Sequence, residues 1–113
     1  MVNTKYGNFT DTEVSDYKTK LHKKIFWLLI YKDPRTSEQY NYVDFNKYFT
    51  TLMKEINGLN TMLLHESSEL IELMSILQAA YNETLMEQFN YHQYRKFILD
   101  AHSMLDKLNF EGE

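Results

Sequence analysis

The sequence has no cysteine, one proline and three glycines among its 113 residues. Without cysteine the chain can have no disulfide framework, no thiol nucleophile and no thiolate zinc site, and this composition fits a reducing compartment. The glycines stand alone at positions 7, 58 and 112, so no glycine-rich loop is available to hold a phosphate group. Thiol chemistry and nucleotide binding through such a loop are therefore excluded.

The sequence also has no long apolar run. The longest run, from Ile25 to Tyr31, has seven residues, whereas a membrane-spanning helix needs about 18 or more. The first five residues lead into no apolar segment of the kind that a secretion signal contains. We therefore expect a cytoplasmic protein with no membrane partner.

Aromatic residues, by contrast, are abundant. The chain contains nine tyrosines, seven phenylalanines and one tryptophan, which is too many for a disordered chain. At this length a single domain over residues 1–113 is expected, and folding should bury about two-thirds of the chain's surface. That amount of burial is enough for one apolar core.

Four segments repeat apolar residues at helical spacing. They predict helices over about 11–32, 44–64, 68–84 and 91–108, with residues 1–9 as an arm and 109–113 as a tail. Thr10 and Glu13 form a capping-box pattern before the first helix, Ser67 or Ser68 is suited to cap the third, and Asn90 the fourth. Similar helix lengths and mostly short connections predict an all-α, antiparallel four-helix bundle in up-down-up-down order.

The first predicted helix carries apolar side chains outside its core-facing stripe. Phe26, Trp27 and Ile30 all point away from that stripe, so the second half of the helix is apolar on every side. Either the 33–43 connection or the N-terminal arm folds over these residues, or they form a surface for a partner. Tyr40 and Tyr42 in the connection would contribute to such a surface, because tyrosine is common in recognition sites.

Charge is distributed unevenly along the chain. Residues 1–35 hold seven basic and four acidic side chains, and residues 36–90 hold two basic and eight acidic ones. The basic residues of the first helix are Lys18, Lys20, His22, Lys23 and Lys24. They suggest nucleic-acid binding as one function, but a solvated helix face explains them as well in a chain of net charge −4.

Three glutamates near the start of the third predicted helix resemble part of a metal site. Glu69 and Glu72 are three residues apart, so their carboxylates lie on adjacent helical turns and could share a hard cation, with Glu66 nearby. Such a site would make the protein a divalent-metal-dependent hydrolase of a phosphorylated substrate. The other interpretation is that these acids stabilise the positive end of the helix dipole.

Taken together, these patterns favour a non-enzymatic, small acidic helical protein that acts by binding another protein. It would serve as an adaptor, an immunity-type protein or a stoichiometric inhibitor, and the partner could be a second copy in a homodimer. We expect no catalytic residues and no cofactor. The predicted partner-binding residues are Phe26, Trp27, Ile30, Tyr40 and Tyr42.

Overall fold

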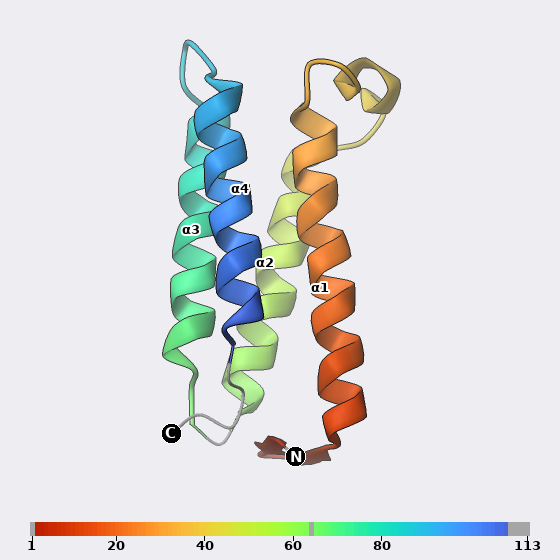
Figure 1. The fold of residues 1–113 in the computed structure, drawn as a ribbon, viewed down its shortest axis with the longest axis vertical. Coiled ribbons are helices and arrows are strands. Elements are labelled where there is room, and N and C mark those ends of the chain that lie inside the picture. Colours follow the sequence, from red (N-terminus) through yellow and green to blue (C-terminus); the bar gives the residue numbers. More distant parts are fainter. Residues whose placement is uncertain (1, 64, 109–113) are drawn as a thin grey trace.

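The computed structural model describes residues 2–63 and 65–108 and contains four packed helices (Figure 1). They are α1 (Asp11–Lys32), α2 (Phe45–Met62), α3 (Ser68–Thr84) and α4 (Tyr91–Asp106). The closest pair is α3 and α4, while α1 packs against α4 and α2 against α3. The predicted all-α helical bundle is thus confirmed. Figure 1 shows the α1–α2 and α3–α4 connections at one end, and the N-terminal segment with the α2–α3 connection at the other.

The helices begin where the sequence offers capping side chains. The Thr10 hydroxyl accepts a 3.1 Å hydrogen bond from the Glu13 amide, and the Glu13 carboxylate accepts one of 2.9 Å from the Thr10 amide. At the other three helices, the side chains of Asp44, Ser67 and Asn90 each accept one hydrogen bond from the amide three residues on. Each cap satisfies amides that have no partner inside the helix.

Two of the four predicted helices differ slightly in length from the observed ones. The helix predicted over 44–64 is α2, which begins one residue later because Asp44 is its cap and ends at Met62. The helix predicted over 91–108 is α4, which ends at Asp106. The bounds of α1 and α3 agree with the prediction.

The core lies between the four helices and consists mainly of leucine and isoleucine. Its most buried large side chains include Leu21, Ile25, Ile56, Leu73, Leu77, Tyr94, Ile98 and Leu105. Tyr94 is the one tyrosine in the buried cluster, and its hydroxyl donates a 2.6 Å hydrogen bond to the Leu28 carbonyl. This bond satisfies the buried hydroxyl and joins α4 to α1.

The N-terminal segment, predicted only as an arm, contains a short hairpin. Strand β1 (Val2–Thr4) pairs antiparallel with β2 (Gly7–Phe9). Gly7 has a φ of 138°, which side chains with a Cβ rarely adopt. The Lys5 amide donates a 2.8 Å hydrogen bond to the Met62 carbonyl, so the hairpin is held against the end of α2. The predicted tail, residues 109–113, lies outside the described residues.

Within the described ranges, every helix is either too short or too polar to span a bilayer.

Candidate functional site

Five aromatic side chains gather where the end of α1 meets the connection to α2. They are Trp27, Tyr31, Tyr40, Tyr42 and Tyr48, and we call them the aromatic cluster. The connection contains a short 3-10 helix, η1 (Ser37–Tyr40). It places the Tyr40 ring edge-on against Trp27, with 5.5 Å between the ring centroids. The connection therefore covers part of the apolar surface of α1.

The aromatic cluster is anchored to the bundle by Tyr48 of α2. The Tyr31 ring lies edge-on to the Tyr48 ring, at a centroid distance of 5.2 Å. The Tyr48 hydroxyl donates a 2.8 Å hydrogen bond to the Lys24 carbonyl. Burial, with smaller effects of Tyr31 and Glu55, raises the pKa of Tyr48 to about 12. The hydroxyl therefore stays protonated at neutral pH and keeps donating this bond.

The predicted partner-binding residues differ in their exposure. Phe26 is 48% exposed, Trp27 37% and Tyr42 78%, whereas Ile30 and Tyr40 are half-buried. The 33–43 connection thus folds over part of this region, as one of the two interpretations expects. Tyr40 covers one side of Trp27, and half of Phe26 faces solvent.

The α3–α4 connection adds apolar side chains at the same end of the bundle (Figure 1). Leu85 is 64% exposed, Met86 58% and Phe89 39%. Nine large apolar or aromatic side chains are exposed in the described part of the chain. Six of them belong to the last turns of α1 or to the two connections at this end, and we call these six the apolar end: Phe26, Trp27, Tyr42, Leu85, Met86 and Phe89.

The two connections of the apolar end are linked through a buried carboxylate. Asp33, which follows α1, accepts hydrogen bonds of 2.9 Å from the backbone amide of Arg35 and 2.9 Å from its guanidinium. These bonds, with a further hydrogen bond from Tyr91, lower the pKa of Asp33 to about 2. Because Tyr91 is the first residue of α4, the charged group joins the end of α1 to the start of α4.

The three glutamates of the metal alternative lie at the beginning of α3. Glu66 and Glu72 are exposed, and Glu69 accepts a 3.0 Å hydrogen bond from the Ser67 hydroxyl. Among residues 2–63 and 65–108, no three histidine, aspartate or glutamate side chains lie where they could hold one metal ion. The position of Glu69 in the first turn matches the favourable interaction with the helix dipole.

Three of the five basic residues over positions 18–24 of α1 contact other elements. Lys18 donates a 2.8 Å hydrogen bond to the Leu108 carbonyl, and His22 lies 2.8 Å from Asp106 of α4. The Lys24 ammonium lies 2.7 Å from the Glu55 carboxylate of α2. Lys18 and His22 thus point toward the end of α4, and Lys24 points toward α2.

His22 also forms a histidine pair that local spacing could not reveal. Its Nδ1 atom lies 2.8 Å from Nδ1 of His102, which is 80 residues away in sequence. A carboxylate accepts only, so Nε2 of His22 donates to Asp106. Either Nδ1 atom can donate in this contact, depending on the tautomers, and the buried Nε2 atom of His102 has no hydrogen-bond partner among the described residues.

Comparison of the chain with protein-family models, curated proteins and solved structures finds no match. The chain's own residues therefore carry the functional argument.

Proposed function

We propose that this protein is non-enzymatic and acts by binding another protein through its apolar end, as an adaptor or a stoichiometric inhibitor. The observation that carries the proposal is the gathering of six exposed large side chains at one end of the bundle. Isolated exposed apolar residues are ordinary on any protein. Their concentration in one region is typical of an interaction site, and a cytoplasmic location suits a chain without cysteine.

The types of side chain at the apolar end support protein recognition. Aromatic residues and methionine are enriched in the buried centres of protein interfaces, and tryptophan and tyrosine are common among the residues that contribute most binding energy. Here Trp27 and Tyr42 supply rigid aromatic area, and Met86 supplies a flexible side chain. Such a surface suits a partner with a complementary apolar patch.

The contacts behind this surface limit the cost of binding. Tyr40 packs on Trp27, and Asp33 joins the end of α1 to Tyr91 at the start of α4. Ordering of loops and side chains on association reduces affinity. Connections that are already held in place avoid much of that cost, so the apolar end is suited to bind a partner with little rearrangement.

Variants with an aspartate at exposed positions test the proposal. Phe26→Asp and Met86→Asp change the apolar end, and Ile71→Asp is the matched control. Ile71 is 48% exposed, as Phe26 is, but lies in the first turn of α3. Each variant is used as bait in affinity capture from cell extract, and its mass is measured by light scattering after size exclusion. A thermal melt confirms that each variant is folded.

The expected result is a partner captured in stoichiometric amount by the wild type and by Ile71→Asp, and lost with both variants of the apolar end. If the partner is a second copy, the same two variants lower the mass from dimer to monomer. The proposal is wrong if capture and mass are the same for all four proteins.

A further inference from the structure

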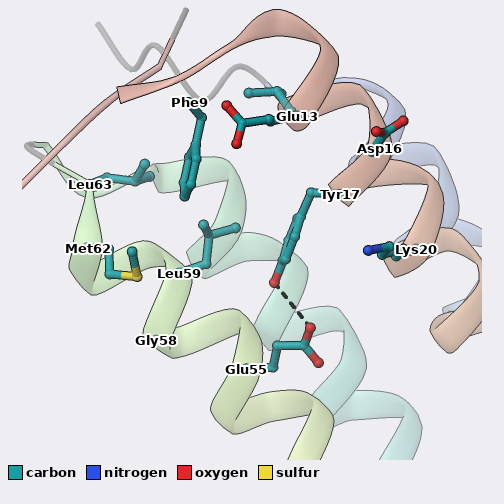
Figure 2. A pocket seen from close by; sticks show the side chains of 11 residues that line it. Phe9, Glu13, Asp16, Tyr17, Lys20, Glu55, Gly58, Leu59, Met62 and Leu63 are labelled. Carbon is teal, nitrogen blue, oxygen red and sulfur yellow. Dashed lines mark hydrogen bonds between the residues drawn. The ribbon is translucent and has the colours of Figure 1, made fainter. Parts of the chain in front are cut away.

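A cavity of about 510 Å³ lies between α1, α2 and the N-terminal hairpin, away from the apolar end. Figure 2 shows the rings of Phe9 and Tyr17 on opposite sides of the space above Leu59. Val14, Met62 and Leu63 complete the apolar lining. The volume falls within the range of about 300–1,000 Å³ that is usual for small-molecule sites.

The charged side chains that line this cavity are mostly acidic. Glu13, Asp16 and Glu55 contribute three carboxylates, and Lys20 one ammonium group. Lys24, which pairs with Glu55, adds a second positive charge beside the lining, so three negative and two positive charges leave a net charge of −1. A cationic ligand is therefore favoured over an anionic one.

Tyr17 and Glu55 define the inner polar edge of the cavity. The Tyr17 hydroxyl donates a 3.5 Å hydrogen bond to the Glu55 carboxylate, drawn as a dashed line in Figure 2. Lys24 holds the same carboxylate with contacts of 2.8 and 2.7 Å. Burial, followed by the charge of Glu55, raises the pKa of Tyr17, so the hydroxyl remains a donor. Asp16 is exposed at the rim.

Gly58 marks a part of the cavity wall that no side chain fills. It lies within α2 and lines the cavity, although glycine inside a helix is less favourable than alanine. A Cβ atom at this position would have no neighbour within 4 Å, so no packing contact in the described part of the chain requires glycine. What the missing side chain leaves is open space in the cavity.

We propose that this cavity binds a small amphiphilic cation, an aromatic or alkyl amine. Its apolar body lies between Phe9 and Tyr17, close to the backbone of Gly58, and its ammonium group lies near Glu55. Aromatic rings suit both parts of such a ligand, since they stack on flat apolar groups and attract cations at their faces. This activity is independent of protein binding at the apolar end.

Three naphthalene probes that differ only in charge test the proposal by calorimetric titration at pH 7. They are 2-(2-naphthyl)ethylamine, the neutral 2-(2-naphthyl)ethanol and the anionic 2-naphthylacetate. The amine is expected to bind one-to-one and at least about tenfold more tightly than the acetate, the low end of what a charge interaction at a protein surface supplies. In the wild-type protein, the backbone amide signal of Gly58 should shift in nuclear magnetic resonance spectra as the amine is added.

Two substitutions of Gly58 locate the site. Gly58→Leu projects a side chain into the cavity and should weaken amine binding by at least about tenfold, the loss of roughly 1.4 kcal/mol. Gly58→Ala adds only a Cβ atom and should retain binding. Glu55→Gln should weaken binding of the amine and leave binding of the neutral alcohol unchanged. Thermal melts show whether each variant is folded.

Several outcomes overturn the proposal. Equal affinity for the amine and the acetate contradicts the charge preference. Unchanged amine affinity in Gly58→Leu, or an unshifted Gly58 signal in the wild type, contradicts the location. Absence of amine binding at millimolar concentration contradicts the activity. None of these results bears on Phe26→Asp or Met86→Asp, whose effects test the apolar end separately.

Discussion

Replacement of Gly58 by alanine should make the protein more stable. Alanine favours a helix interior over glycine by about 0.8–1.0 kcal/mol, because glycine loses more backbone freedom on folding. The added Cβ atom meets no atom within 4 Å, so neither a steric cost nor a packing gain enters the sum. We expect the free energy of unfolding to rise by about 1 kcal/mol.

The corresponding shift of the thermal midpoint follows from the size of the chain. Unfolding entropy is about 2.1 cal/mol/K per residue, so a chain of 113 residues has a total of roughly 240 cal/mol/K. A gain of about 1 kcal/mol then raises the midpoint by about 4 °C. Urea unfolding followed by circular dichroism should give the same gain with an unchanged slope against urea concentration.

A loss of stability in Gly58→Ala would refute this reasoning. It would mean that α2 departs from regular helix at Gly58, or that another group occupies the space beside it. Open space around the Cβ position shows that close helix packing does not require glycine here.

Three further predictions concern single contacts. Tyr94→Phe removes the hydrogen bond to the Leu28 carbonyl and should lower the free energy of unfolding by about 0.5–1.5 kcal/mol. A smaller change, measured by urea unfolding, would contradict a stabilising role of the hydroxyl. Burial and the charge of His22 lower the pKa of His102 from its ordinary value of 6.5, against the opposing effect of Asp106. The unfolded chain therefore binds a proton more readily, so the free energy of unfolding should fall as pH decreases from about 7 to 5. Urea unfolding at each pH should show that this free energy falls less in His102→Gln than in the wild type. Mg²⁺ or EDTA should leave the thermal midpoint unchanged. A saturable gain in the free energy of unfolding of about 2.7 kcal/mol at ~100 times the metal's dissociation constant, absent in Glu69→Gln, would favour the metal-dependent hydrolase.

The parts of the fold that depend on local sequence could be predicted. The first residues of α1 and α3 follow from Thr10 with Glu13 and from Ser67, because a capping side chain bonds to amides two or three residues away. The ends of α2 and α4 carry no such signal, and the predictions extend two residues too far. The N-terminal hairpin was missed because strands of three residues are too short to show an alternating pattern.

The candidate sites were only partly predictable, for a physical reason. Helical periodicity identified Phe26 and Trp27 as apolar residues outside the core stripe, and the structure leaves both exposed. The contact of Tyr40 with Trp27 depends on the path of a connection, and that of His22 with His102 depends on which helices become neighbours. The cavity beside Gly58 exists only once the hairpin has packed on α2, which no local pattern indicates.

The neighbour relation of α1 and α4 has a consequence for the order of folding. Four hydrogen bonds join these helices or the residues that follow them: Tyr94 to Leu28, His22 to His102, His22 to Asp106, and Lys18 to Leu108, at sequence separations of 66, 80, 84 and 90 residues. Helices α3 and α4, by contrast, are separated only by the short connection 85–90. Closing a long loop costs more chain entropy than closing a short one, so we expect α3 and α4 to associate first and α1 to dock last. The contact between the bundle's first and last helices is then the last part of the native state to form.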